Sequence, residues 1–258
     1  VYKRQMLNRE PYIDLVIGPQ SYHKINNTIL NFIENKSRNE ITDFDSISKF
    51  DYLSKIENKK SKVSSFLTIQ EGCDKFCHFC VVPYTRGPEY SRPFYQILEE
   101  AEILVKKGAK EIILLGQNVN SYKANGTDFV ELLRHLDEIE NLERLRFISP
   151  HPKDFHSELA EAFITLPSLC EQMHLPLQSG SDRILRKMRR WYTMETFYEK
   201  VALLRDRIPH ATLSTDLIVG FPGETEEEFE MTMEAVRNVR FDLIYSFKYS
   251  ARKGTFLL

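Results

Sequence analysis

Three of the four cysteines in this 258-residue chain lie within eight positions, at Cys73, Cys77 and Cys80. Cysteine thiolates bind zinc and iron–sulfur clusters, and a closed structural site needs four protein ligands. Three ligands leave one metal position open for chemistry, so the spacing favours an iron–sulfur cluster. A structural zinc site completed by His78 or a distant residue is the alternative, although the sequence lacks the two separated C-x2-C knuckles typical of zinc.

The elements that must position these cysteines alternate between strand and helix patterns from residue 64 onward. Apolar runs predict strands at residues 65–70, 111–115, 144–148, 172–177, 212–219 and 243–249. Amphipathic patterns predict helices at residues 93–107, around 129–136, around 197–204, and after a capping box formed by Thr225 and Glu228. We therefore expect an α/β fold, a partial parallel (β/α) barrel of about six units, with a flat doubly wound sheet as the alternative.

The position of the cysteines agrees with this architecture. They directly follow the first predicted barrel strand, and the loops at the carboxyl ends of strands build the active sites of α/β barrels. The sequence thus predicts a catalytic centre at that end of the barrel.

The region before the barrel divides into two segments. Residues 1–33 contain an apolar run and a helical pattern, which predict a short α/β unit. Residues 34–62 are polar and highly charged, and they predict a linker with local helix around residues 47–56. The domain that carries the chemistry is then residues 63–258.

Composition excludes some classes of function. The formal net charge is −2, whereas a stand-alone nucleic-acid binder usually has a basic surplus. No apolar run approaches the roughly 18 to 20 residues of a membrane helix, and the start of the chain does not resemble a signal peptide. We therefore expect a cytoplasmic protein with no membrane partner, and the first residue, Val1, suggests a piece of a longer one.

The cysteine spacing also resembles a known family. Cys73-x3-Cys77-x2-Cys80, with the aromatic Phe79 before the last cysteine, is similar to the radical S-adenosylmethionine superfamily. The resemblance implies one 4Fe-4S cluster whose open iron binds S-adenosylmethionine and whose electron releases a 5′-deoxyadenosyl radical. It also implies that Phe79 belongs to the cofactor-binding residues.

The same resemblance implies further cofactor-binding residues at strand ends. Gly116, Gln117 and Asn118 end the second strand, where the superfamily binds the amino group of S-adenosylmethionine. Gln178 and Ser179 end the fourth strand, near the expected ribose and carboxylate. Asp216 lies inside the fifth strand and faces either the lumen or the helix layer. The alternative for each is a polar residue that caps a helix or satisfies backbone groups.

Flanking motifs resemble the methylthiotransferase branch of the superfamily. They include Pro-Tyr-Thr-Arg-Gly at residues 83–87, Gly-Gln-Asn-Val-Asn at 116–120 and His-Leu-Pro-Leu-Gln-Ser-Gly-Ser at 174–181. These motifs are most similar to enzymes that add a methylthio group to carbon 2 of dimethylallyl-adenosine beside the tRNA anticodon. The alternatives are a threonylcarbamoyl-adenosine substrate, a ribosomal-protein aspartate substrate, and a non-catalytic zinc module.

The branch also implies partners and further domains. Its full-length members carry an N-terminal domain with three more cysteines for a second 4Fe-4S cluster, and a C-terminal RNA-binding domain. No cysteine precedes Cys73, so we expect residues 1–33 to be the tail of that first domain and this chain alone to cleave S-adenosylmethionine without modifying tRNA. The implied partners are the tRNA anticodon stem-loop and an electron donor such as flavodoxin or ferredoxin.

Two other features carry weaker hypotheses. The basic run at residues 186–190 precedes Trp191 and Tyr192. It is interpreted as a solvated helix face with Trp191 packed on the barrel, or alternatively as an RNA-facing surface. His151 ends the third strand and either points into the site or is simply hydrogen-bonded.

Overall fold

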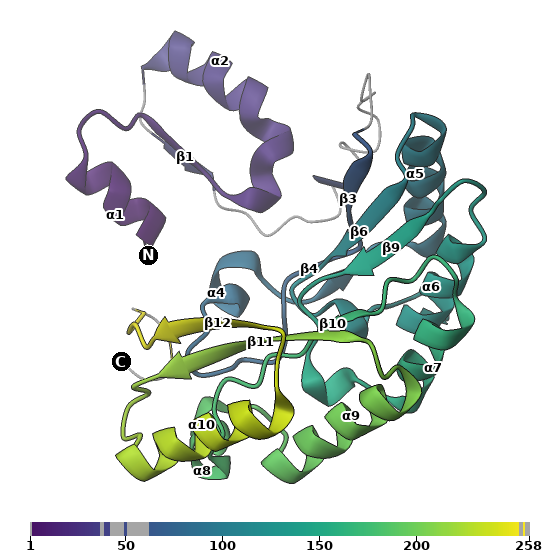
Figure 1. Cartoon of the computed structure of the whole chain (residues 1–258). Coiled ribbons are helices and arrows are strands. Elements are labelled where there is room, and N and C mark those ends of the chain that lie inside the picture. The colour runs from purple at the N-terminus through teal and green to yellow at the C-terminus, as the bar shows by residue number, and fades with distance from the viewer. Residues whose placement is uncertain (1, 37–38, 42–48, 51–61, 253–254, 256–258) are drawn as a thin grey trace.

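Six parallel strands in chain order form the centre of the molecule (Figure 1). The structure, a computed structural model, describes residues 2–36, 39–41, 49–50, 62–252 and 255. One sheet contains β3 (Ser64–Thr68), β6 (Glu111–Leu115) and β9 (Arg144–Phe147), and the other contains β10 (Gln172–His174), β11 (Thr212–Val219) and β12 (Leu243–Lys248). A parallel bridge between Leu145 and Leu169 joins the two sheets.

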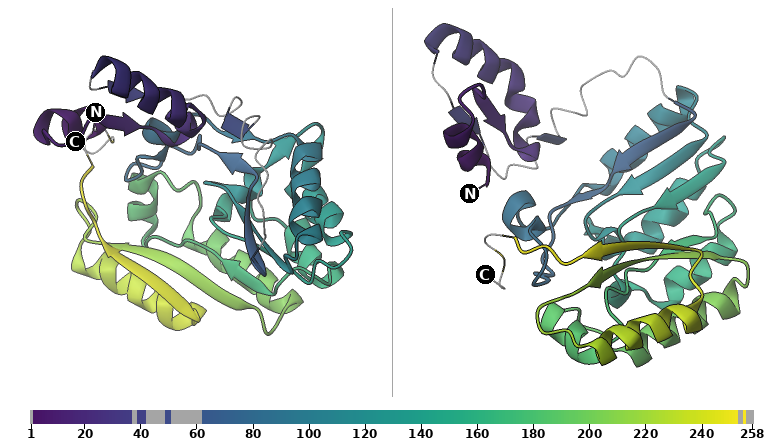
Figure 2. Two further views of the ribbon diagram at one scale, coloured as in Figure 1. Left: turned by 90° about the horizontal axis from the view of Figure 1, so that it is seen from above. Right: turned by 60° about the vertical axis from the view of Figure 1, so that its left-hand side comes forward.

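Helices cover the outer face of these strands (Figure 2). They are α5 (Phe94–Lys106), α6 (Phe129–Asp137), α7 (Ser157–Thr165), α8 (Asp182–Met188), α9 (Met194–Arg207) and α10 (Glu226–Val239). Each helix turns its apolar stripe toward the sheet; α5, for example, buries Ile97, Ala101, Leu104 and Val105. The predicted capping box of Thr225 and Glu228 is present at the start of α10.

The strand order confirms the partial-barrel prediction. A doubly wound sheet reverses its strand order at a switch point, whereas here the order β3-β6-β9 continues into β10-β11-β12 without reversal. The strands at 111–115 and 212–219 have the predicted bounds. Helix α7 was not predicted, and α8 was anticipated only in part, through the interpretation of residues 186–190 as a helix face.

Several short helices and strands lie in the loops that follow the first three barrel strands, around the cysteines. They are β4 (Gln70–Glu71), α4 (Val82–Arg86), β5 (Tyr90–Ser91), η2 (Val119–Ser121), β7 (Lys123–Ala124), β8 (Thr127–Asp128) and η3 (Pro152–Asp154). The antiparallel pair β4–β5 brackets the cysteine loop. No helix in the described part of the chain is long and apolar enough to cross a membrane.

The N-terminal unit is a small separate layer. It contains α1 (Tyr2–Arg9), β1 (Leu15–Ile17), η1 (Pro19–Lys24), α2 (Ile25–Asn35) and β2 (Asn39–Ile41). Strand β2 pairs in parallel with β1, although its residues fall in the segment predicted as a linker. The side chain of Gln20 donates a 2.7 Å hydrogen bond to the carbonyl of Arg86, so this unit contacts α4 beside the cysteine loop.

A second part of the predicted linker also packs on the barrel. Phe50 is buried; its ring stacks on Tyr90 at 6.1 Å and lies 4.7 Å from the guanidinium of Arg92. Lys49 forms a buried ion pair with Glu71 in β4. The predicted helix around residues 47–56 lies mostly outside the described residues, of which Lys49 and Phe50 are helical.

Candidate functional site

The cysteine loop is fixed to the barrel on its first side by backbone contacts. Gly72 has a left-handed φ of 77°, and a β-carbon there would lie 1.9 Å from the carbonyl oxygen of Pro88, so only glycine fits. The Gly72 N–H donates to Oε1 of Gln117 at 2.7 Å. The Cys73 N–H donates to the carbonyl of Gly87 at 3.3 Å. These bonds set the first cysteine against the end of the second barrel strand.

The other side of the loop is fixed to the end of α8. The His78 N–H donates to the Met188 carbonyl at 3.1 Å, and His78 Nδ1 donates to the Lys187 carbonyl at 2.6 Å. The histidine proposed as a zinc ligand therefore anchors the loop to α8. Phe79 packs against Ile184, Met188 and Phe221, three fully buried side chains.

The three thiols lie close enough to influence one another. Burial first, and then the neighbouring Cys77 and Cys80, raise the pKa of Cys73 to about 11, although the Lys75 N–H lowers it. Burial followed by Cys77 also raises the pKa of Cys80. The free thiols of Cys73 and Cys80 therefore stay protonated at neutral pH, and the positive charge of a bound metal is what would convert them to thiolates.

The arrangement of the thiols fits a cluster better than a single ion. Within the part of the chain that the structure describes, no three His, Cys, Asp or Glu side chains converge to hold one metal ion. A 4Fe-4S cluster binds each thiolate through a different iron, so its ligands do not have to converge on one point. Three thiols in one loop that do not converge on a single point therefore fit such a cluster.

The end of the second strand is held by Gln70 of β4. Its Oε1 accepts from the Asn118 N–H and its Nε2 donates to Ser121 Oγ, both at 2.9 Å. Gly116 leaves room for this side chain, because a β-carbon there would lie 2.9 Å from Gln70 Oε1. Asn118 Nδ2 donates to Asp154 at 3.0 Å, whereas Asn118 Oδ1 is buried without a partner.

The end of the fourth strand has a similar unsatisfied group. Gln178 takes a left-handed φ of 71° and its backbone bridges β11, donating to the Asp216 carbonyl and accepting from the Ile218 N–H. Its side-chain Oε1 is buried and has no partner. Ser179 is fully buried, and its hydroxyl accepts from the Ser181 N–H at 3.2 Å. Buried polar atoms are normally paired, so these orphans point to a polar ligand.

Asp216 faces the concave side of the barrel. Its neighbours in β11, Leu213 and Leu217, belong to the main apolar core, and side chains alternate between the faces of a strand. The carboxylate instead meets Nε2 of His174 at 3.2 Å, and Nδ1 of the same ring lies 2.9 Å from Ser214 Oγ. Sequence analysis named His174 only as part of a motif. The signal that could have found it is its place inside the strand predicted at residues 172–177, four residues before Gln178.

The interpretation of the basic run as a solvated helix face with Trp191 packed on the barrel is wrong in part. Arg186, Lys187 and Arg189 are exposed, but Arg190 is only 4% exposed and so is not part of a solvated face. Trp191 is 55% exposed and is not packed on the barrel. Arg189 and Lys153 lie over its ring at 5.0 and 5.7 Å.

His151 is buried at the third strand end. Its N–H and carbonyl both bond to the Asn120 side chain, and its Nδ1 accepts from the Lys153 N–H at 3.1 Å. Its Nε2 has no partner. Burial, followed by the charge of Arg190, lowers the pKa of His151 far below its usual value, so the ring is neutral.

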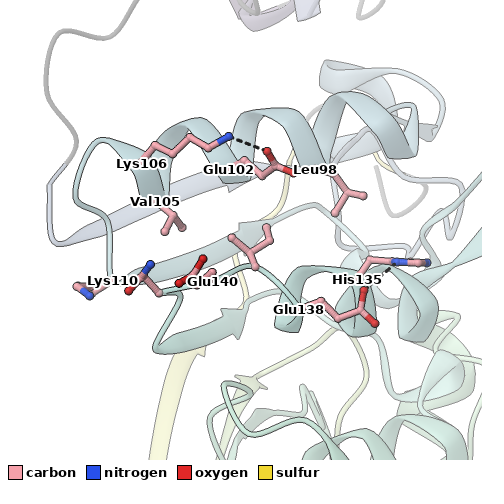
Figure 3. A pocket seen from close by; sticks show the side chains of 10 residues that line it. Leu98, Glu102, Val105, Lys106, Lys110, His135, Glu138 and Glu140 are labelled. Atoms are coloured by element: carbon pink, nitrogen blue, oxygen red, sulfur yellow. Dashed lines mark hydrogen bonds and ion pairs between the residues drawn. The ribbon is translucent and has the colours of Figure 1, made fainter.

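Two cavities differ in their relation to this site. A cavity of about 310 Å³ lies at the cysteine end, lined by residues that include Asp74, Lys75 and Trp191. A cavity of about 670 Å³ lies between α5 and α6 (Figure 3), with Lys110 at the amino end of β6 on its wall. The second cavity is therefore at the opposite end of the strands from the cysteines and is not part of the site.

A partial parallel barrel with a cysteine triad and orphaned polar groups at the carboxyl ends of its strands defines an enzyme of radical chemistry built around an iron–sulfur cofactor. The sequence model of the Radical SAM superfamily matches residues 67–236, and the chain belongs to this superfamily. A 4Fe-4S cluster and S-adenosylmethionine are the cofactors of the superfamily.

Curated relatives narrow the comparison. The chain is 57% identical over 256 residues to tRNA-2-methylthio-N(6)-dimethylallyladenosine synthase of Pelagibacter ubique (strain HTCC1062), covering 98% of this chain and 57% of the relative. It is 47% identical to the enzyme of the same name from Anaplasma marginale (strain St. Maries), covering 97% of this chain and 56% of the relative. The chain thus spans a little over half the length of these relatives.

Solved structures share the fold. The radical S-adenosylmethionine methyltransferase TsrM of Kitasatospora setae superposes with a TM-score of 0.60 at 20% identity, covering 71% of this chain and 36% of that one. Coproporphyrinogen III oxidase of Escherichia coli gives a TM-score of 0.52 at 16% identity, covering 76% and 46%. At these identities the likeness establishes the fold alone.

Proposed function

We propose that the chain is the radical core of a tRNA methylthiotransferase that adds a methylthio group to carbon 2 of dimethylallyl-adenosine beside the anticodon. The single observation that carries this proposal is the triad of Cys73, Cys77 and Cys80 at the carboxyl end of the first barrel strand, in a chain 57% identical to the Pelagibacter enzyme. The proposal covers the whole protein, of which this chain accounts for part.

The residues of the chain have separable roles in this proposal. Cys73, Cys77 and Cys80 hold the cluster. When bound, the cluster would supply the electron for the reductive cleavage of S-adenosylmethionine. The chain itself positions the substrate and excludes water from the concave face of the barrel.

The orphaned acceptors support an assignment for S-adenosylmethionine. Asn118 Oδ1 and Gln178 Oε1 are buried and unpaired, and both are suited to accept from the amino and hydroxyl groups of the ligand. Gln117 accepts from the Gly72 N–H of the cysteine loop, and Ser179 accepts from the Ser181 N–H after the fourth strand. Asp216, on the concave face, is a further acceptor, and Phe79 packs beside the loop as an apolar wall.

The tRNA anticodon stem-loop is the proposed partner, in the cytoplasm, with a small electron-transfer protein such as flavodoxin or ferredoxin as the reductant. The exposed Trp191 ring between Arg189 and Lys153 supports an RNA contact, because aromatic and guanidinium groups stack on unpaired bases. Arg189 and Lys153 give this patch a local positive charge for RNA phosphates, although the net charge of the whole chain is −2.

Anaerobic assays test the proposal. The chain, reconstituted with iron and sulfide and reduced with dithionite, is expected to convert S-adenosylmethionine to 5′-deoxyadenosine, measured by liquid chromatography and mass spectrometry. The Cys77→Ala chain is the matched control and is expected to give none. Equal product from both chains would contradict the assigned cluster.

The substrate is tested separately with tRNA. The protein that contains this chain is incubated with tRNA carrying dimethylallyl-adenosine or threonylcarbamoyl-adenosine, and the digested nucleosides are analysed by mass spectrometry. The proposal predicts a methylthio product from the first tRNA only. A product from the second tRNA alone would replace the proposed substrate with the alternative.

A further inference from the structure

Arg190 lies within a basic run but points into the protein. Its side chain is 4% exposed, while the neighbouring residues 189 and 191 are exposed. Both neighbours have a φ of 60°, in the left-handed region that is unusual for non-glycine residues. The left-handed backbone at Arg189 and Trp191 accompanies an inward side chain at Arg190 and outward side chains at its two neighbours.

The buried guanidinium has three hydrogen-bond acceptors. Nη1 donates to Cys77 Sγ at 3.5 Å, Nη2 donates to the Pro176 carbonyl at 3.1 Å, and Nε donates to the Tyr192 hydroxyl at 3.0 Å. Within the described residues no carboxylate forms an ion pair with Arg190. A charge buried without an opposite charge is costly, and natural interiors normally pair it.

The acceptors differ in the charge they can carry. A carbonyl is neutral, and a tyrosine hydroxyl is ordinarily neutral at pH 7. A cysteine sulfur becomes an anion when it ligates a metal. Cys77 is therefore the one hydrogen-bond acceptor of Arg190 that gains a negative charge in the working protein.

A purely structural role does not explain the arginine. The Tyr192 hydroxyl already donates toward the carbonyls of Pro176 and Leu177, each at 2.8 Å. The carbonyl that Arg190 contacts would therefore keep a donor if the arginine were replaced. Among the described residues, Arg190 is the one basic side chain that donates a hydrogen bond to Cys77 Sγ, and it is buried.

We infer that Arg190 is a positioning residue that acts as the internal counter-charge of the cluster: it orients Cys77 and raises the reduction potential of the iron–sulfur centre. This inference rests on the proposed function, since it requires the cluster. Hydrogen bonds to the ligating sulfurs and nearby charge are the terms through which a protein sets such potentials. A positive charge stabilises the reduced cluster, which carries one more electron, relative to the oxidised one.

An EPR-monitored redox titration of the reconstituted 258-residue chain tests the inference, with S-adenosylmethionine absent. Arg190→Gln is expected to lower the equilibrium constant for reduction at least tenfold, which is a negative shift of 59 mV for a one-electron couple. Arg190→Lys keeps the charge and is expected to shift less. Arg186→Gln, the same change in an exposed residue of the same basic run, is expected to leave the potential unchanged.

The outcomes separate this inference from the proposed function. Absence of a 4Fe-4S signal in the unaltered chain refutes the proposed function, and the inference with it. A normal cluster in Arg190→Gln at an unchanged potential refutes the inference alone, as does an equal shift in Arg186→Gln. If Arg190→Gln and Arg190→Lys both fail to fold as metal-free chains by circular dichroism, the role is structural and the inference is overturned. A folded Arg190→Gln chain that loses its cluster while Arg190→Lys retains one supports the counter-charge.

Discussion

Glu228 joins α10 to the loop that follows β10, and its removal is predicted to loosen that loop. The side chain is 7% exposed, and its carboxylate accepts from Ser181 Oγ at 2.8 Å, Arg183 Nε at 2.7 Å and the Thr225 N–H at 3.0 Å. Arg183 Nη2 donates to the second oxygen as well. The Arg183 hydrogen bond is the main cause that lowers the pKa of Glu228 from 4.5 to about 2.

The size of the effect follows from this shift. Each pKa unit corresponds to about 1.4 kcal/mol, so the lowering of the Glu228 pKa from 4.5 to about 2 gives an upper bound of about 3.5 kcal/mol. The Arg183 side chain is 46% exposed, so solvent screening reduces the expected contribution to about 2 kcal/mol. Because the folded pKa lies below the unfolded value, the folded state binds fewer protons. The contribution is therefore complete above pH 4.5 and is lost as the pH falls toward 2.

Urea unfolding followed by circular dichroism measures this contribution in the unaltered chain and in Glu228→Gln. We expect a difference in unfolding free energy of about 2 kcal/mol at pH 7 that shrinks by more than half at pH 3. Glu230→Gln is the matched control on the same helix, because its exposed pair with Arg237 is worth under about 1 kcal/mol. A gap that is absent at pH 7, or that is as large at pH 3 as at pH 7, refutes the reasoning.

Three further substitutions test other parts of the site. Gly180→Ala places a β-carbon 2.5 Å from the Thr232 α-carbon, so α10 must shift. The affinity for S-adenosylmethionine, measured by calorimetry on the reconstituted chain, is expected to fall at least tenfold, and an unchanged affinity would contradict the packing argument. Gln70→Ala leaves the Asn118 N–H unpaired and is expected to cost about 2 kcal/mol in urea unfolding, whereas a cost below about 0.5 kcal/mol would show that the bond is dispensable. Cys77→Ala is expected to reduce iron and acid-labile sulfide after reconstitution to background, and retention of a full cluster would remove Cys77 from the ligand set.

The architecture was predictable from sequence because it rests on short-range periodicity. Period-two and period-3.6 patterns depend on neighbours within one element, and they placed all six barrel strands, two of them with the observed bounds. Helix α8 was anticipated only as a solvated face at its basic end, and its buried stripe of Ile184, Leu185 and Met188 was not predicted. Strand β2 was missed because it has only three residues, Asn39–Ile41, and a single apolar side chain among them is too short a pattern to predict a strand.

The site was predictable only where its chemistry is local in sequence. The three cysteines lie within eight consecutive positions, so their spacing alone was enough to find them. The contact between Arg190 and Cys77 spans 113 positions, and it depends on left-handed backbone at two non-glycine residues that no residue pattern encodes. The link from Gln70 to Asn118 spans 48 positions and is likewise a product of the folded barrel.

The central claim is that three thiols hold a 4Fe-4S cluster whose fourth iron is open to S-adenosylmethionine. EPR of the reconstituted, dithionite-reduced chain before and after addition of S-adenosylmethionine tests it most directly. The account predicts one signal from a reduced 4Fe-4S cluster that changes shape when the ligand is added. Zinc without iron, or a cluster signal that S-adenosylmethionine leaves unchanged, would contradict it.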